Sequence, residues 1–246
     1  MPRPSSVVTA LLTGVCLPGL PLHAQDPSDS AGYRALTQTP LAAFVPGPTA
    51  SLTGIHRSGP ALQLRYGLVS YGDNTFTHSF GLGGDVAVGS GRLGIMGGDY
   101  HPACGNDTCP GHFMAALTYS DNLLGATLGR PGSRATINVG LDLGVGYGAP
   151  HDGTLLAASA SMPIALVPAG RAVRFFSFVA PGLGGGSAPV NGRTEQGLRA
   201  RFSAGVGVLL LDEHLGATVG VDRVFLRGGN WVAGVGLTWT GGHSTR

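Results

Sequence analysis

The sequence predicts an all-β fold: a closed transmembrane antiparallel β-barrel of about ten strands, within a range of eight to twelve. Three observations predict it: apolar residues alternate with small or polar ones over long stretches, no apolar run is long enough for a membrane-spanning helix, and short and long connections alternate. Composition agrees, because 43% of the 246 residues are hydrophobic and only 11% are charged. The 43 glycines follow no G-X-Y period, which excludes collagen, and a net charge of +2 without a basic cluster argues against nucleic-acid binding.

Residues 1–24 are expected to form a cleaved signal peptide. Arg3 precedes an apolar stretch that ends at Leu22-His23-Ala24, and two prolines within it argue against a membrane-spanning helix. A buried helix is the alternative. The proline-containing residues 25–60 are then a periplasmic leader, residues 61–240 the barrel and residues 241–246 a short tail.

The alternation is clearest between Ala135 and Tyr147, where every odd position is apolar and every even one is polar or glycine. The stretches 198–210 and 231–239 follow the same pattern. Strands of this length exceed the five or six residues usual in soluble sheets and match the roughly 9 to 11 residues that cross a bilayer. In this way we predict strands at 61–72, 76–88, 92–100, 112–129, 134–148, 154–166, 171–181, 198–211, 214–226 and 230–240.

The connections provide a second criterion. The odd-numbered links include the long segments 101–111 and 182–197 together with 149–153, whereas the even-numbered links, such as 90–91 and 212–213, are tight. Membrane barrels have short periplasmic turns and longer outer loops, so the tight turns and, for an even strand count, both termini are expected in the periplasm.

One strand changes phase. Apolar residues occupy odd positions between Phe113 and Tyr119 but even positions between Leu124 and Leu128. A β-bulge near residues 120–122 would keep ten strands, and we favour it. A turn there would instead require an extra strand from the leader, for example residues 49–56, to give twelve.

Two tryptophans mark the last strand. Trp231 and Trp239 share one face and lie eight residues apart, about 26 Å along the strand and about 20 Å along the membrane normal at a 40° tilt. This separation suits an aromatic girdle at each membrane interface. The alternative is a pair of core tryptophans in a soluble, secreted β-sandwich.

From about residue 61 onward, the chain resembles the small outer-membrane β-barrel proteins of diderm bacteria. The resemblance is architectural and includes no specific motif. It implies an outer-membrane location, contact with outer-membrane lipids, insertion by the barrel assembly machinery and a monomeric state. Many such proteins end on an aromatic residue, whereas here residues 240–246 follow Trp239.

A loop assigned to the outside carries Cys104 and Cys109, flanked by His101 and His112. We expect a Cys104–Cys109 disulfide, because two cysteines in an oxidising compartment usually pair. A Cys2His2 zinc site is the alternative, and no metal is expected if the disulfide forms.

No catalytic residue is predicted. His78 and Ser79 are neighbours in a strand and therefore point to opposite faces, and His151-Asp152 resembles a solvated turn. The glycine-rich stretches lack the strand, loop and helix context of a nucleotide site, so no cofactor is expected.

Charged residues within the strands are assigned to the lumen, because an Arg facing lipid near the midplane costs about 2 to 4 kcal/mol. A tight turn at residues 212–213 would place Asp222 opposite Ser203 and diagonal to Arg201. The same alternation points Val139 and Val206 toward lipid and Gly207 inward, where a Gly207→Ser change should be tolerated. The predicted lumen network consists of Arg65, Asp85, Asp142, Arg199, Arg201 and Asp222.

These observations predict a non-catalytic outer-membrane barrel: a surface scaffold, an adhesion-type module or a narrow solute pathway whose ligand the sequence does not identify. The lumen charges would either plug the interior or select a solute. The alternatives are an outer-membrane enzyme, similar to lipid A deacylases or omptins, and a secreted β-sandwich.

Overall fold

The structure is a computed structural model that describes residues 59–70, 76–101, 103–104, 107–108, 111–130, 133–149, 153–169, 173–190, 192–210, 214–224 and 231–241. The expected signal peptide, residues 25–58 of the expected leader and residues 242–246 of the tail lie outside these ranges. All regular elements in them are strands: β1 (Ala61–Ser70), β2 (Phe76–Val88), β3 (Gly91–His101), β4 (Ala103–Cys104), β5 (Asp107–Thr108), β6 (His112–Arg130), β7 (Ser133–Gly148), β8 (Leu155–Ser161), β9 (Ile164–Pro168), β10 (Arg174–Val190), β11 (Arg193–Leu210), β12 (Leu215–Val224) and β13 (Trp231–Thr240). In the described ranges, no helix has the length and apolar character needed to cross a membrane.

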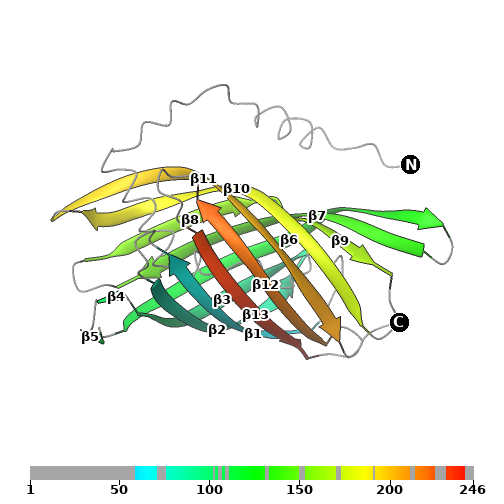
Figure 1. Cartoon of the computed structure of the whole chain (residues 1–246), viewed down its shortest axis with the longest axis horizontal. Coiled ribbons are helices and arrows are strands. Elements are labelled where there is room, and N and C mark those ends of the chain that lie inside the picture. The colour runs from blue at the N-terminus through cyan, green and yellow to red at the C-terminus, as the bar shows by residue number, and fades with distance from the viewer. Residues whose placement is uncertain are drawn as a thin grey trace, which may run out of the picture.

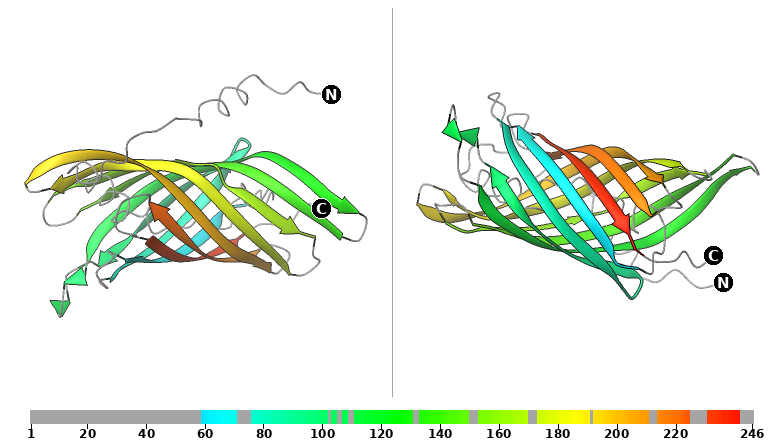
Figure 2. Two further views of the ribbon diagram at one scale, coloured as in Figure 1. Left: turned by 45° about the horizontal axis from the view of Figure 1, so that its top comes forward. Right: turned by 90° about the horizontal axis from the view of Figure 1, so that it is seen from below.

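The main sheet closes on itself. Each strand is antiparallel to its neighbours, and β1 pairs with β13 from Ala61 opposite Thr240 to Ser70 opposite Trp231. Strands β8 and β9 both pair with β7 and β10, so they fill a single position in the barrel. The closed ring therefore has ten strand positions, as predicted, and Figures 1 and 2 show it as one curved, strongly tilted sheet.

The interruption between β8 and β9 is local. It falls at Met162-Pro163, where proline has no N–H to donate. Hydrogen bonding continues across the gap, because Met162 N donates to Pro181 O (2.9 Å) and Gly140 N donates to Pro163 O (2.8 Å). The single continuous strand expected at 154–166 is therefore two shorter strands, β8 and β9, and the second ends at Pro168.

The phase change in β6 is a β-bulge, as predicted. Pairing with β7 shifts between Asn122 and Leu124, and β6 continues without a turn to Arg130. The bulge returns apolar side chains to the outer face, where Leu124 and Leu128 lie opposite Val139 and Ala135.

The prediction of a long loop at 182–197 is wrong. Strands β10 and β11 pair throughout this range, as far as Val190 opposite Arg193, and the turn beyond them contains Gly192 with a φ of +75°. The glycines belong to the sheet because the backbones approach closely: a Cβ on Gly186 would stand 1.8 Å from the Leu156 carbonyl oxygen. Strands β10 and β11 consequently extend well beyond their predicted ends at 181 and 198.

The barrel has an apolar outer face and a mixed inner face. Val206, Val219 and Val235 are each about half exposed on neighbouring strands, and every strand position contributes at least one such side chain. Trp231 and Trp239 also point outward, with 37% and 54% of their surface exposed. This distribution is the reverse of a β-sandwich, whose apolar residues face its interior.

Both ends of the barrel sheet meet at one end of the molecule. Gly241 N, just after β13, donates to Pro60 O, just before β1, over 3.0 Å. The turn between β2 and β3 lies at this same end, which we call the turn end. The opposite end, with β4, β5 and the tip of the β10–β11 hairpin, is the outer end (Figure 1).

Candidate functional site: the charged lumen

The inner face carries a lateral row of polar side chains that crosses six strand positions. Arg92 lies opposite Ser120, Ser120 opposite Asp142, and Asp142 opposite Ser161. The row continues through Gly182 on β10 to Arg201 on β11. Strict alternation directs all of these positions inward, so residues far apart in sequence form one polar band around the lumen.

Asp85 is the centre of a first cluster. Its two carboxylate oxygens accept hydrogen bonds from Arg92 Nε and Gln63 Nε2, and Arg65 Nη2 donates to Gln63 Oε1. All four side chains are more than nine-tenths buried. Arg92 is also tied to the chain entering the barrel, because its Nη2 donates to the Gly59 carbonyl over 2.8 Å.

A second cluster lies across the lumen. Asp222 faces Ser203 across the β11–β12 pair, which is the register predicted from the tight turn. The carboxylate of Asp222 accepts a hydrogen bond from Arg201 Nη2 in an ion pair. Asp222 is 1% exposed and Arg201 6%, so both charges are held away from bulk solvent. Asp85 and Asp222 therefore each have an arginine as ion-pair partner, as buried charges require.

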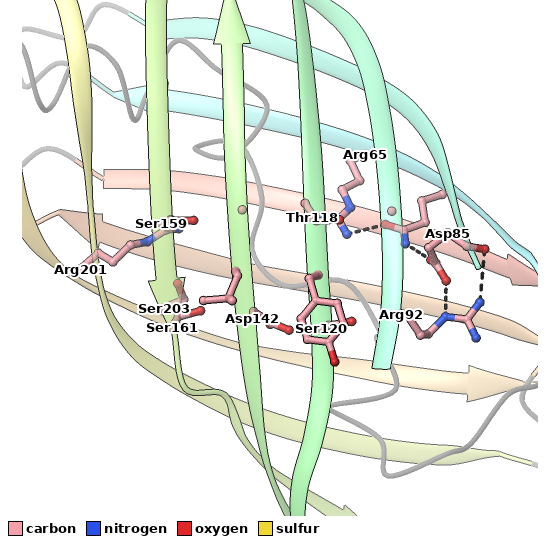
Figure 3. Close-up of a pocket in the computed structure, with 15 residues that line it drawn as sticks. Arg65, Asp85, Arg92, Thr118, Ser120, Asp142, Ser159, Ser161, Arg201 and Ser203 are labelled. Carbon is pink, nitrogen blue, oxygen red and sulfur yellow. Dashed lines mark hydrogen bonds and ion pairs between the residues drawn. The ribbon is translucent and has the colours of Figure 1, made fainter. Parts of the chain in front are cut away.

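The two clusters border one cavity (Figure 3). Its volume is about 70 Å³, room for a few water molecules. Ser159, Ser161 and Ser203 surround Arg201 on one side, Arg65 and Arg92 with Asp85 lie on the other, and Asp142 lies between them. Arg201 Nε is buried and has no hydrogen-bond partner among the described residues.

Apolar side chains fill the lumen on the turn-end side of the polar band. Phe176 and Phe178 of β10 pack with Ala165, Val167 and Leu209, all at most 4% exposed. Their rings, 6.4 Å apart between centroids, occupy space left by two glycines of β11. The lumen on this side of the polar band is therefore a packed apolar core that lies beside the small polar cavity.

This packing corrects one expectation. A Cβ on Gly207 would stand 2.2 Å from Phe176 Cζ and 2.8 Å from the Ala217 carbonyl oxygen. The residue does point inward, but the space beside it is already occupied, so we expect Gly207→Ser to be destabilising rather than tolerated.

The predicted lumen residues all lie on inward-facing positions. Arg65, Asp85, Asp142 and Arg201 line the cavity, and Asp222 is bonded to Arg201. Arg199 also points inward but is only half-buried, one inward position further toward the outer end.

Sequence reasoning missed two members of the first cluster, Gln63 and Arg92. Gln63 has the same parity as Arg65 on β1, and Arg92 has the same parity as Gly94 and Met96 on β3. The parity was therefore available, but an uncharged Gln and an Arg next to a turn gave no reason to select them.

The cysteine loop lies largely outside the described residues. Backbone pairing places Cys104 opposite Asp107 in the small β4–β5 sheet, whereas Cys109 is not described. The Cys104–Cys109 disulfide therefore stays a prediction. Among the described side chains, no group of three His, Cys, Asp or Glu residues could hold a metal ion.

The considered catalytic pair is divided between the two faces of the barrel. Ser79 is buried, while His78 is exposed and its Nδ1 hydrogen-bonds the Tyr66 hydroxyl on the outer face. The His151-Asp152 pair lies outside the described residues.

No protein-family model matches this chain, and no curated protein sequence matches it. Among solved structures, it is similar to the N-terminal β-barrel domain of Pseudomonas aeruginosa OprF, with 14% identity, a TM-score of 0.27, and coverage of 74% of this chain and 97% of that one. It is also similar to Ail, the attachment invasion locus protein of Yersinia pestis, with 9% identity, a TM-score of 0.26, and coverage of 75% and 100%. At these values the likeness carries no information about activity.

Proposed function

We propose that this chain is a non-conducting outer-membrane β-barrel that acts as a surface scaffold, holding its outer loops and the β10–β11 hairpin outside the cell. The filled lumen is the observation that carries this proposal. In the part of the chain that the structure describes, two buried ion-pair clusters and the Phe176–Phe178 cluster occupy the interior, and the cavity between the ion pairs is small.

The exposed apolar belt supports membrane insertion. Soluble monomers rarely expose contiguous apolar patches larger than a few hundred Å². Here large apolar side chains face outward from all ten strand positions, and the charged groups of the polar band face inward. Such a surface is stable in lipid and would aggregate in water.

The outer end supports a display role. Strand β11 runs from Arg193, and among the described residues its pairing with β12 begins at Arg201, so eight residues extend beyond this described pairing. Strand β10 accompanies them and forms a paired hairpin. A paired hairpin presents its side chains in a defined geometry, as a contact surface for another molecule requires.

Single-channel recording tests the closed lumen. The mature protein, refolded from detergent into a planar bilayer, should give no conductance steps. The matched variants are Phe176→Ala/Phe178→Ala, which empties the inner cluster, and Phe175→Ala, which removes an outward ring. We expect steps only in the double variant. Steps in the unmodified protein would overturn the scaffold proposal in favour of a solute pathway.

Orientation is tested by labelling intact cells with a membrane-impermeant maleimide. In a background where Cys104 and Cys109 are serine, Thr194→Cys at the outer end should react in intact cells. Arg134→Cys at the turn end should react only after permeabilisation. The reverse pattern would contradict the proposed orientation, and labelling of both sites in intact cells would contradict membrane insertion.

A further inference from the structure

The closed barrel has one open strand edge at its turn end. Strand β3 pairs with β6 from His112 to Asp121. Its first residue, Gly91, lies opposite Asp121, but β6 continues beyond this point to Arg130. Among the described residues, no strand pairs with this edge of β6 beyond Asp121. On its other side β6 pairs with β7, which β9 covers in turn. In Figures 1 and 2 the β6–β7 hairpin extends past its neighbours at the end opposite β4 and β5.

Apart from the bulge at Asn122–Leu124, this edge has few of the features that normally prevent strand addition. Between Leu123 and Gly129 there is no charge and no proline, and Leu123, Leu124 and Leu128 are each about half exposed. Exposed edges are usually protected by charged side chains, prolines or bulges that twist them away. An unpaired edge also cannot lie in hydrocarbon, because its N–H and C=O groups would have no partners. The edge therefore needs a covering strand or lies beyond the lipid.

The position of the incoming chain identifies a covering strand. The first described residue, Gly59, is bonded through its carbonyl to Arg92, and Arg92 lies opposite Ser120. Gly59 itself lies just before β1, so β2 and β3 separate it from β6, and the Arg92 side chain reaches it from the level of Ser120, next to the point where the β6 edge opens. A segment that ends there and starts near Arg130 runs opposite to β6, as antiparallel pairing requires.

The available length and chemistry also fit. The open edge covers residues 122–130, about 30 Å at 3.3 Å per residue. Residues 49–56, the extra strand considered from the sequence, cover about 26 Å and end three residues before Gly59. Prolines occur at 46, 48 and 60 but not between, so every amide from Thr49 to Gly59 can donate.

A second copy of the chain does not fit this edge. Two barrels inserted the same way round in one membrane are related by an axis along the membrane normal. Strands tilted by about 40° and related in this way cross at about 80°, far from the antiparallel alignment that a shared ladder needs. We propose that residues 49–56 of the same chain add to the open edge of β6 as an antiparallel strand and close the sheet at the turn end.

Amide hydrogen exchange, read by residue on the mature chain in detergent micelles, tests this proposal. Along β6 from Leu123 to Gly129, alternate amides face β7 and the open edge. In the unmodified protein both sets should be protected. In Leu52→Pro or Thr53→Pro the edge-facing amides should exchange at least about tenfold faster, while those facing β7 stay unchanged. Both variants are needed because only one of two adjacent N–H groups points toward β6. Thr37→Pro, further from the barrel, is the matched control and should have no effect.

Three results would overturn the proposal. Edge-facing amides that exchange at the rate of an unstructured peptide in the unmodified protein would mean that nothing covers the edge. Protection that survives both proline variants but falls on dilution would identify a second copy. Protection that survives both and is independent of concentration would mean that another element or the detergent covers the edge. None of these readouts depends on conductance, so failure here leaves the scaffold proposal intact.

Discussion

Removing one partner of the Arg201–Asp222 ion pair should destabilise the barrel strongly and unequally. Asp222 is 1% exposed, and it is not among the residues that line the cavity. Arg201 is also buried but faces the cavity, with Ser161 and Ser203 nearby. Water can therefore hydrate an unpaired Arg201, whereas an unpaired Asp222 has little access to water.

The magnitudes follow from this difference. Breaking a buried pair typically costs about 3 to 5 kcal/mol, because one charge is left uncompensated. We expect Arg201→Ala to cost about that much and Asp222→Ala about 2 to 3 kcal/mol, since cavity water offsets part of the penalty. The double variant removes both charges and should cost about 2 to 4 kcal/mol, mainly from lost packing of the arginine stem. The coupling energy of the pair should then be at least about 1 kcal/mol, and about 3.5 kcal/mol for the midpoints of these ranges.

The assay is reversible unfolding in urea or guanidinium, with the protein in micelles, followed by the fluorescence of Trp231 and Trp239. Arg193→Ala, at the exposed start of β11, is the control and should change the free energy of unfolding by less than about 0.5 kcal/mol. Additivity of the two single variants within about 0.5 kcal/mol would show that the groups do not interact. A larger loss in Asp222→Ala than in Arg201→Ala would refute the role assigned to cavity water.

Three further results are expected. Val206→Arg should lower the stability of the inserted barrel by about 2 to 4 kcal/mol, measured by unfolding from lipid vesicles, while Val206→Leu should be tolerated; equal effects would contradict the lipid-facing assignment. Gly207→Ala should cost about 1 to 3 kcal/mol by overpacking, and Phe176→Leu in the same chain should recover part of the loss; a neutral Gly207→Ala would show that the inner cluster is loose. The mature protein should show no maleimide-reactive thiol until reduced, because Cys104 and Cys109 are expected to be bridged; two thiols before reduction, or bound zinc, would contradict this.

Much of the fold was available from the sequence because a β-strand directs alternate side chains to opposite faces. That rule placed Arg65, Asp85 and Asp222 inside the barrel and Val206 outside it. The shift of parity after Tyr119 identified the bulge, since one extra residue reverses the two faces. The tight turn before His214 set the β11–β12 register, and with it Ser203 opposite Asp222.

Alternation does not say how closely two backbones approach or what fills the space between opposite walls. Glycine is typical of loops but also of strands that pack against a neighbouring backbone, so only the closed sheet shows that Gly186 is a strand residue beside Leu156. Likewise, the space beside Gly207 is filled by the ring of Phe176, which comes from another strand, and alternation within β11 gives no sign of this. The hydrogen bonds of Gln63 and Arg92 to Asp85 likewise became visible only in the closed sheet, because the three residues come from different strands. The sequence determined the direction of each side chain through local stereochemistry, but closure of the sheet decided which inward-pointing groups meet, because these contacts join strands that are far apart in the chain.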